Sequence, residues 1–134
     1  MSQQAVIPMS YRFVPGDDLR QVVVAASVRD GVQAGCVLTT VGSLSRARLR
    51  FAGQPDYSII DGDLEILSLV GTLGPDGPHL HLTVADASGR TFGGHMGDGC
   101  IVRTTAEVVV CRLPGVTFRR VMDKRTGYRE LSIE

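Results

Sequence analysis

Short β-favouring runs separated by glycine-containing turns make up most of this chain, and their spacing limits what it can fold into. Glycine occurs 16 times in 134 residues, whereas tryptophan is absent and aromatic residues are only 5% of the total. Val, Ile and Thr favour pleated strands, and tight turns favour glycine. The length suits one hydrophobic core. We therefore expect a single domain, residues 1–134, with an aliphatic core between strands.

One stretch has helical periodicity instead. Between residues 19 and 29 apolar side chains recur at three- and four-residue intervals, which places them on one face of a helix. We expect Asp17 to cap its first turn, Asp18 to favour its positive end and Gly31 to end it. The prediction is an α+β domain, in which a single antiparallel-rich sheet or barrel-like sandwich packs on one main helix.

The other segments have the composition of strands. Residues 33–44 are nearly continuous in apolar residues, with an interruption expected near Gly42, and Asp61-Gly62 has the composition of a hairpin turn. The expected strands are residues 11–14, 33–44, 45–51, 57–60, 63–73, 79–86, 90–96, 100–113, 116–122 and 128–133. No linker or internal repeat divides them, in agreement with one domain.

Cysteine usage and hydropathy indicate the compartment. Cys36, Cys100 and Cys111 are an odd number at wide spacings, without a CxxC pair, so a disulfide framework is not expected. No apolar run reaches 18 residues, so no transmembrane helix is expected. The first 13 residues lack the basic and apolar regions of a signal peptide. A cytoplasmic protein without membrane association is predicted.

Charge is unevenly distributed along a chain whose net charge is zero. Residues 1–52 hold six basic and three acidic groups, residues 53–107 hold two and eight, and residues 108–134 hold six and three. The segment charges are thus +3, −6 and +3. All the histidines lie in the acidic segment. Negative surroundings attract cations and repel a nucleic-acid backbone, so this region is expected to favour a metal ion.

His79, His81 and His95 are the only histidines, and strand geometry predicts that they converge. Residues two apart on a strand face the same side, so His79 and His81 point together. Three neutral imidazoles on one face suit zinc and leave a fourth coordination position for water or substrate. Iron, nickel and manganese are alternatives. The competing interpretation is a group of polar histidines on a solvated sheet face.

The third histidine joins the other two only in one hairpin register. A three-residue loop that ends at a left-handed Gly89 pairs Asp86 with Arg90. The same register places His81 opposite His95, with Cβ atoms about 5 Å apart. A two-residue loop would turn His95 to the other face. Several glycines are expected to leave the rim of the site uncrowded: Gly93, Gly94, Gly97 and Gly99.

Three further side chains are candidates for chemistry at this site. Glu65 lies in an apolar strand, where a carboxylate is costly to bury unpaired, and is either a general base, a partner for an arginine such as Arg50, or a solvent-facing group. Glu107 has the same alternatives and could orient an imidazole. Cys100 is either an additional thiolate ligand or a buried thiol.

Arginines form the main alternative binding surface. Arg46, Arg48 and Arg50 share one strand face and could hold an anionic ligand or nucleic acid, unless they are a solvated face or a subunit contact. No aromatic residues are interleaved for base stacking, and the net charge is zero. The same alternatives apply to a C-terminal basic group: Arg119, Arg120, Lys124 and Arg125.

Several motifs together resemble the PPC (plants and prokaryotes conserved) domain, also called DUF296. The densest match runs from His79-Leu80-His81 to Gly93-Gly94-His95-Met96. The other matching segments are Arg12 to Leu19, Val41 to Leu44, Leu49 to Phe51, Leu64 to Leu73 and Thr105 to Val109. The resemblance covers almost the whole chain.

The resemblance implies a compact α+β subunit that assembles as a homotrimer. Bacterial members are often labelled PD1-like DNA-binding proteins, whereas plant members grip DNA through an Arg-Gly-Arg-Pro core that this chain lacks. The family fold is also similar to that of acetolactate decarboxylase, whose zinc sits on an HxH pair and a later histidine. His79, His81 and His95 occupy the matching positions.

Three hypotheses follow. The leading one is a zinc-binding homotrimeric module that recognises a small anionic molecule. The second is a DNA-associated regulatory protein that uses the arginine stripe. The third is a metal-dependent, lyase-like enzyme in which Glu65 or Glu107 transfers protons beside a metal-bound water.

Overall fold

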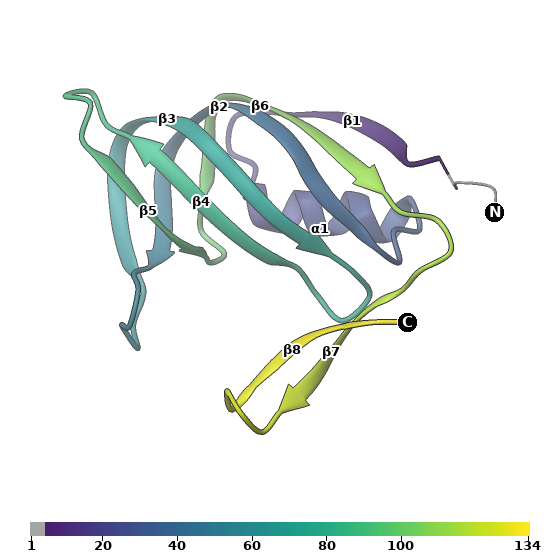
Figure 1. Ribbon diagram of the computed structural model, residues 1–134. Coiled ribbons are helices and arrows are strands. Elements are labelled where there is room, and N and C mark those ends of the chain that lie inside the picture. Colours follow the sequence, from purple (N-terminus) through teal and green to yellow (C-terminus); the bar gives the residue numbers. More distant parts are fainter. Residues whose placement is uncertain (1–4) are drawn as a thin grey trace.

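A computed structural model describes residues 5–134 and shows a curved sheet with one helix packed against it (Figure 1). Residues 1–4 of the expected domain lie outside the described part. In chain order the elements are β1 (Ile7–Phe13), α1 (Leu19–Arg29), β2 (Gly35–Arg50), β3 (Ser58–Leu73), β4 (His79–Ala85), β5 (Thr91–Met96), β6 (Ile101–Arg112), β7 (Phe118–Asp123) and β8 (Tyr128–Ile133). The predicted α+β, antiparallel-rich fold is confirmed.

Six antiparallel strands form the main sheet, in the order β1-β6-β2-β3-β4-β5. The last strand, β5, also pairs with the end of β2, where Leu49 lies opposite Met96 and Arg50 opposite His95. This second pairing closes β2, β3, β4 and β5 into a barrel-like ring. Aliphatic side chains fill its interior, and Leu44, Leu49 and Leu82 are fully buried there.

Helix α1 has the predicted bounds but not the predicted cap. Asp18, not Asp17, is the N-cap residue, because its carboxylate accepts a hydrogen bond from the Gln21 N–H at 3.3 Å. The other Asp18 oxygen accepts from the Gly99 N–H at 2.7 Å and ties the helix to the loop after β5. Gly31 follows the helix at a φ of 67°. Within residues 5–134, no helix is long and apolar enough to cross a membrane.

Strands β2 and β3 are longer than the sequence predicted. Each has 16 residues, so the break expected at Gly42 and the hairpin turn expected at Asp61-Gly62 are both wrong. Gly42 lies within β2 at a φ of 154°, and a Cβ there would lie 2.1 Å from the Thr105 carbonyl oxygen. This glycine permits close approach of two strands instead of ending one. Strand β1 likewise begins earlier than expected.

A separate two-stranded hairpin, β7–β8, follows the barrel and lies beside the end where β3 turns into β4 (Figure 1). The Phe118 N–H donates to the Gln33 carbonyl at 2.9 Å. Asp76, in the β3–β4 turn, accepts from the Arg120 N–H at 3.0 Å and from the Arg119 side chain at 3.3 Å. These contacts fix the hairpin against the barrel.

Candidate metal centre

The β4–β5 hairpin has the register predicted from its loop. Asp86 and Arg90 close a loop whose last residue, Gly89, has a φ of 82°, and His81 lies opposite His95. The Asp86 carboxylate accepts hydrogen bonds from the Ser88 hydroxyl at 2.8 Å and the Arg90 N–H at 3.0 Å. The Ser88 hydroxyl is the main cause that lowers the pKa of Asp86 to about 2. The loop is therefore held by its own side chains.

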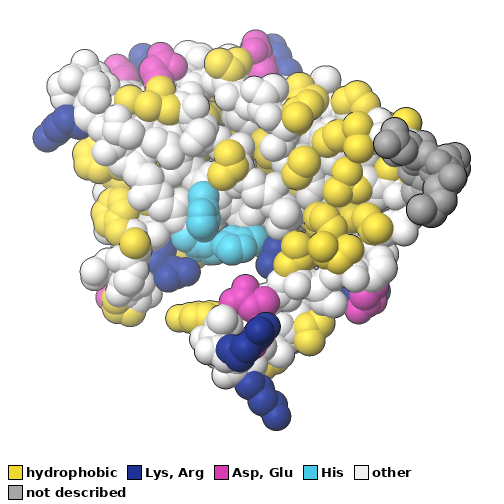
Figure 2. All heavy atoms as spheres, viewed as in Figure 1, with side chains coloured by type: hydrophobic (Ala, Val, Ile, Leu, Met, Phe, Trp, Pro, Cys, Tyr) yellow, Lys and Arg dark blue, Asp and Glu magenta, His cyan; other side chains and the backbone are white. Residues whose placement is uncertain are grey.

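This register brings the three histidines together. One nitrogen from each of His79, His81 and His95 lies within 4.8 Å of the other two, and the ring centroids are 5.0, 5.4 and 5.8 Å apart. Figure 2 shows the three rings side by side in a hollow of the surface, with basic side chains on both sides. Zinc–nitrogen bonds of about 2.0 Å require ligand atoms roughly 3.3 Å apart. Small side-chain rotations would bring the imidazoles to that spacing.

Desolvation favours the neutral, ligating form of His79 and His95 by lowering the pKa of each. The pKa of His79 is lowered by desolvation first, and then by the neighbouring His81 and Arg120. The pKa of His95 is lowered by desolvation first and then by Arg50. A proton competes with a metal ion for the same nitrogen lone pair. Both shifts therefore favour a coordinating imidazole near neutral pH.

Strand pairing puts an arginine directly beside the cluster. Arg50 of β2 lies opposite His95 of β5, which lies opposite His81 of β4. The close approach of β5 to β2 depends on Gly94, since a Cβ there would lie 2.6 Å from the Arg50 carbonyl oxygen. This glycine therefore packs against β2, whereas the sequence interpretation gave it the role of leaving the rim of the site uncrowded.

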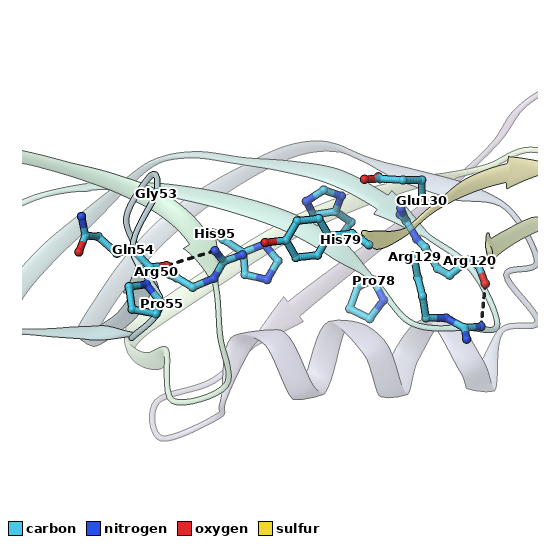
Figure 3. Close-up of a pocket in the computed structure, with 11 residues that line it drawn as sticks. Arg50, Gly53, Gln54, Pro55, Pro78, His79, His95, Arg120, Arg129 and Glu130 are labelled. Atoms are coloured by element: carbon cyan, nitrogen blue, oxygen red, sulfur yellow. Dashed lines mark hydrogen bonds between the residues drawn. The ribbon is translucent and has the colours of Figure 1, made fainter. Parts of the chain in front are cut away.

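A cleft of about 650 Å³ adjoins the histidines, within the range of small-molecule sites. His79 and His95 line its floor, Arg50 lies on the β2 side, and Arg120, Arg129 and Glu130 lie on the hairpin side (Figure 3). The remaining lining residues are Gly53, Gln54, Pro55, Pro78 and Tyr128. Three arginines and one carboxylate give the cleft a positive character.

The negative surroundings predicted from the acidic middle segment are therefore wrong. Five aspartates of that segment form ion pairs with arginines elsewhere on the surface: Asp61, Asp63, Asp76, Asp86 and Asp98. None of these five lines the cleft. The acidic residues near the histidines in sequence did not predict the sign of the electrostatic field there. The arginines that line the cleft come from β2, β7 and β8.

The three arginines predicted to share one face of β2 have three different environments. Arg46 pairs with Asp61 at 2.7 Å. Arg48 lies over the Tyr57 ring, 4.0 Å from its centroid. Only Arg50 faces the cleft. Of the C-terminal basic residues named from the sequence, Arg120 reaches the cleft, while the contributions of Tyr128, Arg129 and Glu130 went unrecognised. Nothing local in the sequence marks them, since their position depends on how the hairpin docks.

The other candidates lie away from the histidines. Glu65 is exposed and pairs in register with Ala85, four residues and thus about 13 Å along β4 from His81. On β2 its register partner is Ser43. The suggested pairing with Arg50 is wrong, because the Arg50 side chain donates to the Gln54 carbonyl. Neither glutamate belongs to the cluster, since Glu107 is exposed on β6, three strands from β4.

Cys100 is a buried thiol. It is fully buried, and its sulfur donates to the Gly97 carbonyl at 3.4 Å. Desolvation raises its pKa to about 11, so the thiol stays protonated at neutral pH. The thiolate needed for metal ligation is therefore disfavoured.

Known proteins share the part of the chain that contains the histidine cluster. The sequence profile of the Plants and Prokaryotes Conserved (PCC) domain matches residues 2–114. The chain belongs to this family. The match contains β1 to β6 and the whole histidine cluster, while β7 and β8 of this PCC protein begin beyond the matched residues.

One set of relatives is much longer than this PCC chain. A protein of Synechococcus named Bifunctional protein GlmU is 50% identical over 123 residues, which are 92% of this chain and 20% of that protein. A second Synechococcus strain has a match of the same size. The PCC chain thus spans about a fifth of the length of these relatives.

Solved structures share the PCC fold. A hypothetical protein from Salmonella enterica has a TM-score of 0.95 at 38% identity, over 99% of this chain and 96% of its own. The metal-containing protein AF0104 from Archaeoglobus fulgidus has a TM-score of 0.78 at 25% identity, over 94% and 93%. A Bacteroides thetaiotaomicron protein whose name proposes DNA binding has a TM-score of 0.82 at 18% identity, over 93% and 91%.

Proposed function

We propose that this PCC protein binds one divalent metal ion, zinc by preference, through His79, His81 and His95, and that the open coordination position receives a small anionic ligand. The observation that carries the proposal is the convergence of three imidazoles beside an arginine-lined cleft. Three histidines with one free position are typical of zinc sites that accept an exogenous ligand. The metal content of the Archaeoglobus protein supports the proposal.

Elemental analysis of protein purified without chelator tests the metal. We expect close to one zinc per chain, and its loss in His81→Ala. Thr83→Ala is the matched control, because Thr83 is the next residue on the same face of β4. Metal-free wild-type protein that also fails to take up added zinc would contradict the proposal. Equal zinc in wild type and His81→Ala would move the site elsewhere.

We also propose that the subunits form a homotrimer, as the family resemblance implies. Strands β2 and β3 expose aliphatic side chains by more than half, among them Leu38, Val41, Leu67 and Val70. Exposed apolar patches of this kind mark association surfaces. Val70 lies opposite His81, so the interface would border the metal centre. Light scattering should give three times the 14.4 kDa chain mass, and Leu67→Glu should lower it.

DNA association is the second candidate function. It is supported by the name of the Bacteroides protein and by arginines of this chain that lack a carboxylate partner. The test is fluorescence anisotropy with a labelled DNA duplex at low salt. Binding that weakens steeply with added salt would favour DNA, and the absence of binding at low salt would remove this candidate.

A further inference from the structure

Among the described residues, most arginines outside the cleft form ion pairs with aspartates, whereas the three arginines that line the cleft do not. Within residues 5–134, seven arginines form ion pairs with aspartates: Arg20, Arg29, Arg46, Arg90, Arg103, Arg119 and Arg125. Across that same range, Arg50, Arg120 and Arg129 have no carboxylate within 4.0 Å. The only acidic residue of the cleft, Glu130, accepts instead from the Thr126 hydroxyl at 2.9 Å. The three guanidinium groups of the cleft thus form no ion pair with the described residues.

These arginines are held in position by neutral groups. The Arg120 side chain donates to the Thr72 hydroxyl at 2.8 Å, and Thr72 is the register partner of His79. The Arg129 side chain donates to the Arg120 carbonyl at 2.7 Å. Each guanidinium has five N–H donors in a fork that matches a carboxylate or phosphate. Donors therefore remain for a ligand after the positioning contacts are made.

A bound metal ion would increase the electrostatic repulsion among the positive charges of the cleft. A divalent cation on three neutral imidazoles adds positive charge beside three guanidinium groups, and these charges repel one another in a partly desolvated cleft. An anion between them reverses the sign of each interaction. Since Arg50 lies on one side of the histidines and Arg120 and Arg129 lie on the other (Figure 3), a single charged group cannot contact all of them equally well.

We propose that the C-terminal hairpin β7–β8 converts the metal centre into a receptor for a small dianion. One anionic group completes the metal coordination beside Arg50, and the second is held by Arg120 and Arg129 on the hairpin. The ligand class is a compact dicarboxylate or a molecule with one carboxylate and one phosphate. This inference rests on the proposed metal site and adds the hairpin as the element that selects the second charge.

Calorimetry with the zinc-loaded protein tests the proposal. The probes are succinate and glutarate, with butyrate as a monoanion of similar length. At least one dicarboxylate should bind tenfold or more tighter than butyrate. Reciprocity of linked binding requires that the same dicarboxylate raise zinc affinity by the factor by which zinc raises dicarboxylate affinity. Equal affinities for mono- and dicarboxylates, or no binding of either, would overturn the proposal.

Two variants separate the hairpin from the metal centre. Arg129→Gln changes an exposed side chain and should remove most of the dicarboxylate preference while zinc affinity stays within threefold. Arg120→Gln should do the same, but it also loses the bond to Thr72. Arg125→Gln is the matched control, because Arg125 pairs with Asp123 on the same hairpin. Unchanged preference in Arg129→Gln would overturn the role of the hairpin, whereas a wild type that binds no zinc would overturn the proposed function and this inference together.

Discussion

Two hairpins border the cleft, and they reach their places by different means. The β4–β5 hairpin carries the histidines, and its geometry is set by a loop of three residues and the hydrogen bonds that Asp86 accepts within it. The β7–β8 hairpin carries Arg120 and Arg129, and its position depends on contacts with Gln33, Gly74 and Asp76 far away in the sequence. Short-range rules determine the first arrangement, and docking determines the second.

The largest effect is expected from shortening the β4–β5 loop. Deletion of Ser88 leaves a two-residue loop, which shifts the pairing register by one and turns His95 away from His79 and His81. We expect complete loss of stoichiometric zinc, measured by elemental analysis. Deletion of Lys124 from the β7–β8 loop is the control and should leave zinc bound. A folded protein without Ser88 that still holds one zinc would show that register is not decisive.

The next largest effect is expected from undocking the second hairpin. A Cβ on Gly74 would lie 2.4 Å from the Phe118 carbonyl oxygen, so Gly74→Val should push β7 away from the barrel. Affinity for the dianion should fall at least tenfold in calorimetry, while zinc affinity should change little. If both affinities fall together, the position of the β7–β8 hairpin also controls the metal centre, and the two hairpins do not act independently.

The same contrast explains what the sequence could predict. The bounds of α1 and the partnership of His81 with His95 follow from local periodicity and one loop, and both are confirmed. The continuity of β2 and β3 was missed because Gly42 and Gly62 have turn-like composition but serve strand bulges and close approach. A glycine has the same sequence signature in either role.

The electrostatics of the site could not be predicted from local composition. The acidic segment around the histidines suggested a negative field. However, Asp61, Asp63 and Asp76 of this segment form ion pairs with arginines from other strands. Arg50, Arg120 and Arg129 come from three separate elements and meet only because β5 closes on β2 and the C-terminal hairpin docks. Long-range pairing therefore decides the sign of the cleft.

A smaller effect on the docking of the β7–β8 hairpin is expected when the Asp76 carboxylate is protonated. The Arg120 N–H, followed by the charge of Arg119, lowers the pKa of Asp76. A depressed pKa stabilises docking above the ordinary aspartate value of about 3.9, and this contribution is lost as pH falls through the lower folded value. The hydrogen-exchange protection factor of the Phe118 amide, which corrects for the pH dependence of intrinsic exchange, should fall below about pH 4. Asp76→Asn should remove that pH dependence, and an unchanged profile would exclude Asp76 as the anchor.

The smallest effect compares one glycine in each loop. Gly89 and Gly127 have φ values of 82° and 77°, and neither has an atom within 4 Å of an added Cβ. Alanine at either position should therefore cost only the left-handed backbone strain, about 1 kcal/mol, or about 4 °C in Tm. Zinc stoichiometry should survive both changes, because the loop length and register stay the same. If Gly89→Ala alone lost zinc, the backbone conformation of the loop, as well as its length, would control how the three histidines converge.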